Sequence, residues 1–238
     1  LINAGSGTIS LAADEDIALG GLLTSNSSST AMTITSSEGA ITDAGSTLVD
    51  IVAASGTVTI DAATGVDIDT TVAILDLDNA TSGNIDINET DALSIHQIDQ
   101  DGTGTVNVDA AGTITVVASQ SGVTATSGNI ELDANGGSSD IVVNDGLTTT
   151  SGNISILADN DITFGADGDV TSTSGNMTVT SDSDNGGTSS GALTMNDGTL
   201  INAGSGTISL AADEDIALGG LLTSNSSSTA MTITSSEG

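Results

Sequence analysis

The chain contains no lysine, arginine, cysteine or proline, and its only aromatic residue is Phe164. His96 is the one side chain that can become positively charged, whereas 32 aspartates and glutamates give a net charge of −32. Proteins that bind nucleic acid contact its phosphates through lysine and arginine. Anionic membrane surfaces attract the same residues. We therefore expect no nucleic-acid partner and no attachment to an anionic membrane.

Further absences limit the fold. No apolar run approaches the roughly 18 residues of a membrane span, so we expect no membrane insertion. Without cysteine the chain has neither disulfides nor thiol chemistry, which leaves its compartment open. Hydrophobic residues still make up 37% of the chain, nearly all of them Ala, Val, Ile and Leu. That content argues against disorder, and the lack of bulky aromatics favours a narrow core of similar aliphatic side chains.

Two kinds of repetition stand out. The letters TSGNI occur at 81–85, 126–130 and 150–154, and TSGNM follows at 173–177. In addition, the stretch 1–39 returns unchanged as 200–238. We interpret this identity as one long repeat, 1–199, followed by the start of the next, 200–238. There is no initiating methionine or signal peptide, so we expect the chain to be a window of a longer tandem array.

A shorter period runs through the whole chain. A small residue precedes each pair of apolar residues that alternate with polar ones, and these small residues recur at intervals of 21 to 31, close to 25 on average. They are Gly7, Ala31, Gly56, Gly83, Gly104, Gly128, Gly152, Gly175 and Gly206. Strict alternation is typical of a strand with one buried and one wet face. Clusters of Gly, Asn, Asp and Ser between the strands indicate turns.

The period favours one architecture. An antiparallel meander is the main alternative, but its hairpin turns are commonly two residues of the Asn-Gly type, whereas here a unit of about 24 residues recurs. That length suits one coil of a parallel β-solenoid, in which coils stack at about 4.8 Å. We predict an all-β, single continuous solenoid over 1–238 without significant helix. Thr-Ser-Gly-Asn-Ile would form a corner and the first inward residue of a strand, and Asn and Ser could form ladders along the axis.

The alternation also predicts which side chains face inward. They are Ile9, Leu11, Ile17, Leu19, Ile34, Val58, Ile60, Ile85, Ile87, Val106, Val108, Ile130, Leu132, Ile154, Ile156, Ile162, Phe164 and Val179.

The stretches GSGTISLAADEDIALGG (5–21), TSGNIELDA (126–134) and TSGNISILADNDITFG (150–165) resemble the repeats of filamentous-haemagglutinin-type exoproteins. The shared pattern is Gly, polar, apolar, polar, apolar, followed within a few residues by Asp-Ile. The resemblance implies a right-handed parallel β-helix in a large secreted surface protein. This chain departs from that family in its complete lack of lysine and arginine.

The acidic residues are the only candidates for site chemistry. Several occur as Asp-x-Asp, a spacing that places two carboxylates on one face of a strand. Hard oxygen donors suit Ca²⁺, so one hypothesis is that Ca²⁺ bridges these carboxylates; the alternative is a solvated acidic surface screened by salt. The candidate ligands are Asp14, Asp16, Asp167, Asp169, Asp182 and Asp184.

Catalysis has little support in the sequence. His96 follows the inward Ile95 and should therefore point outward, and there is no cation to stabilise an oxyanion. Paired carboxylates could hydrolyse a glycosidic bond, but a sugar subsite usually needs an aromatic platform. Thr-x-Thr pairs such as Thr33 and Thr35 have the spacing of ice-binding ladders, which Asn and Asp interrupt elsewhere. We expect neither an enzyme nor an ice-binding protein.

The remaining expectation is a structural protein at the cell surface or outside the cell. It would form a rod, stalk or self-assembling fibre, with its own copies as partners. The alternative is the stalk of a haemagglutinin-like adhesin that binds a cell surface or a glycan through a tip beyond this chain.

Overall fold

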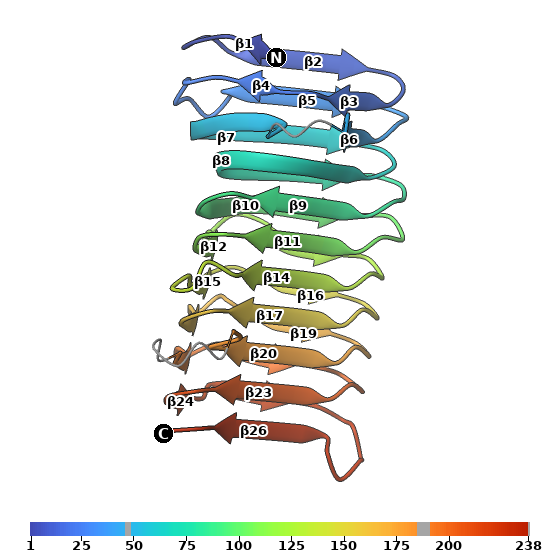
Figure 1. The fold of residues 1–238 in the computed structure, drawn as a ribbon. Helices are drawn as coiled ribbons and strands as arrows, with labels where there is room; N and C mark the ends of the chain where they lie inside the picture. The colour runs from blue at the N-terminus through green and yellow to red at the C-terminus, as the bar shows by residue number, and fades with distance from the viewer. Residues whose placement is uncertain (46–48, 185–190, 238) are drawn as a thin grey trace.

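The computed structural model describes residues 1–45, 49–184 and 191–237, and these residues form one parallel β-solenoid without a helix (Figure 1). The rod has about 10 turns of about 23 residues each. All strand pairings in the described residues are parallel, and each joins one coil to the next. The all-β parallel solenoid predicted from the period is confirmed.

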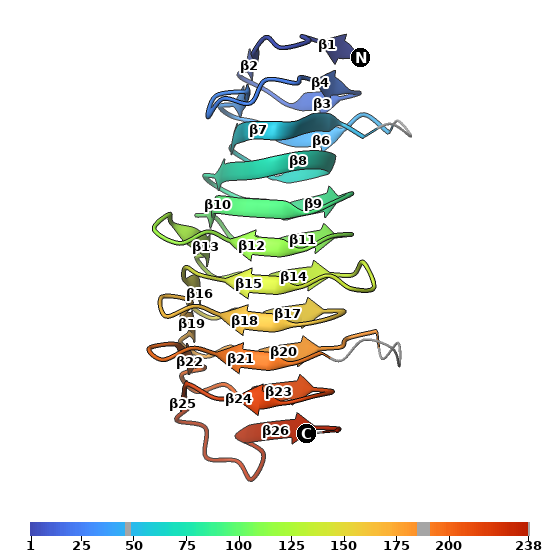
Figure 2. The ribbon, with the colours of Figure 1, turned by 90° about the vertical axis from the view of Figure 1, so that its left-hand side faces the viewer.

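The C-terminal part of the rod is three-sided (Figure 2). Its long side consists of five-residue strands: β9 (Ile85–Glu89), β11 (Val106–Ala110), β14 (Ile130–Ala134), β17 (Ile154–Ala158), β20 (Met177–Ser181), β23 (Ile208–Ala212) and β26 (Met231–Ser235). A first short side follows in each coil: β12 (Ile114–Val116), β15 (Ile141–Val143), β18 (Ile162–Phe164), β21 (Leu193–Met195) and β24 (Ile216–Ala217). A second short side closes the coil: β13 (Gly122–Ala125), β16 (Leu147–Thr149), β19 (Val170–Ser172), β22 (Leu200–Asn202) and β25 (Gly220–Leu222).

The N-terminal part has the same three sides in the same order. Its long strands are β2 (Ile9–Ala13) and β5 (Met32–Ser36), its first short strands β3 (Ile17–Leu19) and β6 (Ile41–Asp43), and its second short strands β1 (Ile2–Asn3) and β4 (Leu22–Leu23). Yet the long strands point in opposite directions at the two ends of the rod: in Figure 1, β2 points to the right and β26 to the left. The long side therefore changes its position around the axis along the rod.

Three unusually long strands make this change: β7 (Ile51–Ala62), β8 (Val66–Asn79) and β10 (Leu93–Gln100). We call them the transition. β8 runs straight past the place where Gly20 and Gly21 form a corner between the short sides of the first coil, and that corner closes. A new corner opens at a bulge in β10, between Ile95 and Gln97. Below it, the two halves of β10 pair separately with β12 and β13.

The transition shifts the two copies of the repeated sequence, 1–39 and 200–238, relative to each other. Ile9 heads a vertical row that continues through Met32 and Val58. Its identical counterpart Ile208 belongs to another row, the one headed by Ile17, which the pairings of the long side carry down the rod. The copies are therefore separated by eight full turns and one further side. The sequence-based expectation of eight coils for the long repeat was too small by that side.

Within each copy the local structure is the same. Ile2 pairs with Leu22 in the first copy, and Ile201 pairs with Leu221 in the second. Likewise, β2 pairs with β5 in the register that β23 and β26 repeat. The ladders also pass residue 200 without a break, because β19 pairs with β22 and β20 with β23.

Aliphatic side chains stacked in rows fill the interior. Sixteen of the eighteen residues predicted to face inward are buried, and the other two, Leu11 and Ile17 in the first coil, are half-buried against the same core. Phe164 is completely buried between Val143 and Met195 of the neighbouring coils. The narrow core inferred from the missing aromatics is therefore present.

Glycine at the corners follows from the close approach of successive coils. A Cβ atom on the corner glycine of one coil would overlap the carbonyl oxygen of the corner glycine in the preceding coil. This holds in turn for Gly104, Gly128, Gly152, Gly175 and Gly206. Because backbone atoms make the contact, no side-chain rotation can relieve it. The recurrent TSGN letters therefore mark a place where only glycine fits.

We predict that Gly152→Ala destabilises the rod by about 1–3 kcal/mol, the usual cost of overpacking a rigid site. Gly146→Ala is the control, because its added Cβ would have no neighbour closer than 3.9 Å. Thermal unfolding followed by circular dichroism measures both. Equal melting temperatures for the two variants would contradict this account of the corner.

Candidate functional site

The corner before each long strand carries a ladder of asparagine side chains. The Oδ1 atom of Asn129 accepts the backbone N–H of Asn153, and Asn153 does the same for Asn176, at 2.9 and 2.8 Å. Asn176 continues the ladder to the N–H of Thr207, at 2.9 Å. The expected axial ladder is thus formed from side chain to backbone, and each asparagine satisfies an amide that the strand pairing leaves over.

A hydroxyl group just before the corner holds the glycine from inside. Thr149 donates to the carbonyl of Gly128 at 2.9 Å, and its oxygen accepts the N–H of Gly152 at 3.2 Å. Ser172 repeats both bonds with Gly152 and Gly175 one coil later. Both side chains are buried. Ladder and hydroxyl together leave the corner with few unsatisfied backbone groups, as a buried turn requires.

The aspartates proposed as calcium ligands occupy similar capping positions. Asp16 accepts the N–H of Ala40 at 2.9 Å, and Asp169 accepts that of Leu200 at 2.7 Å. Asp14 accepts the hydroxyl of Ser37 at 3.3 Å. Each carboxylate thus connects its own coil to the next. This use of Asp-x-Asp explains why the spacing recurs without requiring a bound ion.

The structure does not gather these aspartates into one place. Asp14 and Asp16 lie after β2, Asp167 and Asp169 between β18 and β19, and Asp182 and Asp184 after β20. Asp182 is half-buried and the other five are exposed. Within residues 1–45, 49–184 and 191–237, no group of three or more His, Cys, Asp or Glu side chains could hold a metal ion.

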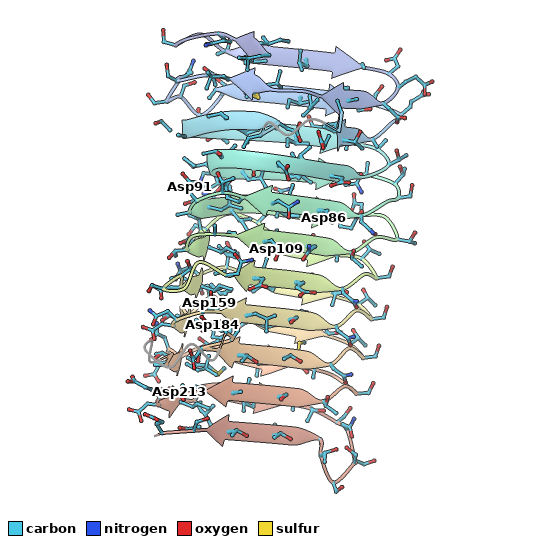
Figure 3. The ribbon with its side chains drawn as sticks, in the orientation of Figure 1. Asp86, Asp91, Asp109, Asp159, Asp184 and Asp213 are labelled. Carbon is cyan, nitrogen blue, oxygen red and sulfur yellow. The ribbon has the colours of Figure 1, made fainter. Side chains whose placement is uncertain are left out.

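The largest concentration of charge lies on the sheet surface near the transition. Asp67, Asp86, Asn107 and Glu131 form one outward row, and Asp69, Asn88, Asp109 and Asp133 form the row beside it. Figure 3 shows Asp86 and Asp109 on this face, whereas Asp91, Asp159, Asp184 and Asp213 follow an edge. We call the two rows the acidic face.

Asparagine amides separate the carboxylates of the acidic face. Asn107 donates to Asp86 at 3.1 Å and to Asp109 at 3.4 Å, and Asn88 donates to Asp69 at 3.2 Å. These amides supply hydrogen-bond donors where other proteins use lysine or arginine. They leave the charge in place, and burial together with the carboxylates of Asp109, Asp159 and Glu131 raises the pKa of Asp133 to about 6.

The transition contains the most strongly perturbed acid. Glu89 is buried and accepts the hydroxyl of Thr70 at 2.8 Å and the N–H of Val72 at 2.9 Å. Its other oxygen accepts the N–H of Asp91 at 3.2 Å. Burial nevertheless raises the pKa of Glu89 to about 7. The carboxylate caps the strand at the place where the corner closes.

Other buried polar groups accompany Glu89. Asn79 accepts the N–H of Gly65 and donates to Gln100, each at 2.9 Å, and both amides are completely buried. Asp50 is also completely buried; it accepts the N–H of Asp69 through Oδ2, and burial raises its pKa to about 6. The sequence analysis did not single out any of these residues. Their signal is a polar residue in a row that elsewhere holds Ala, Thr or Ser.

The remaining features give no catalytic arrangement. His96 is half-buried on β10 beside the bulge, and the Ser121 N–H donates to its backbone carbonyl at 3.2 Å. The surface has shallow depressions, one of them lined by Thr42, Asp67, Asn84 and Asp86. None of the described segments forms a helix that could cross a bilayer.

Comparison with known proteins gives no relative. No family model, no curated protein and no solved structure matches this chain.

The raised pKa values predict unusual pH dependence. An acid whose folded-state pKa is raised contributes stability below its unfolded pKa, and that contribution is lost as the pH rises through the folded value. Glu89 therefore loses it up to about pH 7, and Asp50 and Asp133 up to about pH 6. We expect the melting temperature to be higher at pH 5 than at pH 8, by on the order of 5 °C.

Glu89→Gln should raise the melting temperature at pH 8 and reduce the difference between the two pH values. The control is Glu131→Gln, which removes one charge from an exposed position and should change the difference less. A melting temperature that falls steadily from pH 8 to pH 5 would be the opposite result.

Proposed function

We propose that this chain is a structural rod segment that works at the cell surface or outside the cell. The observation that carries the proposal is the set of unbroken axial ladders through about 10 turns. Every described coil is held by its neighbours through backbone hydrogen bonds, capped corners and one aliphatic core. Such a fold resists extension along its axis because many bonds must break together.

The surface chemistry supports the same role. A rod with 32 acidic residues and no lysine or arginine stays hydrated and repels other rods side to side. It also offers no cleavage site to proteases that cut after lysine or arginine, which suits a protein exposed outside the cell. The resemblance to haemagglutinin-type repeats agrees with this location.

An adhesin stalk is the second candidate, supported by that resemblance alone. The two functions differ in what the isolated segment does: a rod segment holds its shape and binds no foreign surface, whereas an adhesive segment binds cells or glycans by itself.

We predict an elongated particle of roughly 48 Å for one chain, from about 10 turns at about 4.8 Å each. Small-angle scattering on dilute protein, with electron microscopy, measures the length. A binding assay on cells and a glycan array, with and without millimolar Ca²⁺, tests adhesion. A compact particle would refute the rod, and saturable glycan binding would favour the adhesin.

Calcium binding by the corner aspartates is a proposal that a direct measurement can decide. If Ca²⁺ bridges Asp167 and Asp169, it should raise the melting temperature beyond the effect of NaCl at the same ionic strength, because it binds the folded state. Asp167→Asn with Asp169→Asn should remove the excess. Asn at 169 can still accept the N–H of Leu200, so the variant tests charge while keeping the cap. Equal effects of both salts would show screening alone.

A further inference from the structure

Large hydrophobic side chains are exposed only at the two ends of the described rod. They are Leu1, Ile2, Leu218, Leu222, Met231 and Ile233. The residues at the C-terminal end lie on the last coil, and Leu1 and Ile2 lie on the first. Along the sides, the described coils expose no comparable residue. The two end faces therefore form the apolar surface of the rod.

The internal identity shows what happens to these residues when a coil covers them. Met231 and Ile233 are 39% and 41% exposed, whereas their counterparts Met32 and Ile34 are 0% exposed beneath β7. At the other end Ile2 is 51% exposed, and its counterpart Ile201 is 0% exposed beneath β19. The same residues in the same strands are thus buried by one more coil. The missing cover is another coil of this solenoid.

The two end faces also fit each other. The last coil ends with the short strand β25 and then the long strand β26, and the first coil begins with the short strand β1 and then the long strand β2. A second copy turned about the rod axis can place β1 under β25 and β2 under β26. Leu221 would then lie on Ile2, and Met231 on Ile9. Ile201 on Leu221 and Ile9 on Met32 show that these pairs stack within the chain.

We infer that a second copy of this chain docks head to tail, with β26 of one copy adding to β2 of the next. The inference rests on the proposed structural role and names its partner and register. The contact joins different surfaces of the two copies, so it does not close on itself and generates an open filament. Main-chain hydrogen bonds between edge strands supply the contact, as in strand addition generally.

Charge opposes this docking and makes it conditional. The corner after β26 carries Glu237, which would stack on the corner of Asp14 and Asp16 in the next copy. The equivalent corners stack within the chain, where Glu38 donates its N–H to the carbonyl of Asp14 at 2.8 Å. No lysine or arginine offsets the repulsion between copies. Filament growth should therefore increase with NaCl concentration.

Cysteine pairs test the register, because the chain has no native cysteine. Docking places the outward Thr232 of one copy beside Ser10 of the next, in the register that joins Ser10 to Thr33 within the chain. Neighbouring strands are close enough for a disulfide. In S10C/T232C, mild oxidation at high salt should give a ladder of covalent multimers on a denaturing gel. The two positions lie at opposite ends of one molecule, so the bonds must be intermolecular.

A second pair detects exchange of the identical segments instead of docking. If residues 200–238 of one copy displaced residues 1–39 of the next, Thr232 would lie beside Thr59, as Thr33 does within the chain. T59C/T232C would then form the ladder and S10C/T232C would not. The mismatched pair S10C/T178C controls for random collision and should give at most a trace of dimer.

Ile233→Asp tests the apolar contact, with Thr232→Asp on the outward face of the same strand as the matched control. A buried, unpaired carboxylate should raise the concentration needed for filaments by at least about tenfold, and the control should raise it less. Scattering on dilute samples confirms that both variants remain rods. Single rods at every salt concentration, or a ladder only from T59C/T232C, would overturn the docking while leaving the rod intact. A compact particle would refute the rod itself.

Discussion

The hydrogen bonds between successive coils are the constraint on which the rest of this structure depends. They fix neighbouring coils at about 4.8 Å, so the closest neighbours of each side chain are those directly above and below it. A residue type therefore succeeds or fails by stacking on its own kind. Aliphatic residues form the core rows, glycine allows the close corners at Gly128 and Gly152, and the asparagines from Asn129 to Asn176 form a ladder.

The same constraint makes acidic residues costly, because it also stacks carboxylates. With no lysine or arginine available, the chain uses backbone N–H groups at the corners and asparagine amides on the acidic face. These donors satisfy hydrogen bonds without neutralising charge. The remaining repulsion and the burial of Glu89 and Asp133 favour the protonated acids. An acidic medium, which unfolds many proteins by protonating paired carboxylates, should therefore stabilise this rod.

Periodicity was enough to predict the solenoid, most of the inward residues and the glycine corners, because each depends on a coil and its immediate neighbours. The transition could not be predicted in the same way, because averaging the period along the chain concealed the shortest coils. Thr70 and Glu89, stacked on each other, are separated by 19 in the sequence, against 24 for Asn129 and Asn153. Where a coil shortens, one corner closes and another opens, and rows that are aliphatic elsewhere receive polar side chains such as Glu89. Their roles depend on that local geometry, which no repeat pattern encodes.

The transition also changes what sequence repetition means for the surface of the rod. Identical outward residues in the two copies, such as Ser10 and Ser209, follow Ile9 and Ile208, which belong to different vertical rows. An array with a whole number of coils per repeat would place every repeated carboxylate along one line and concentrate the repulsion there. One extra side per repeat moves the copies around the axis instead. A strictly repeated acidic sequence can thus distribute its charge around the rod while keeping every coil-to-coil contact the same.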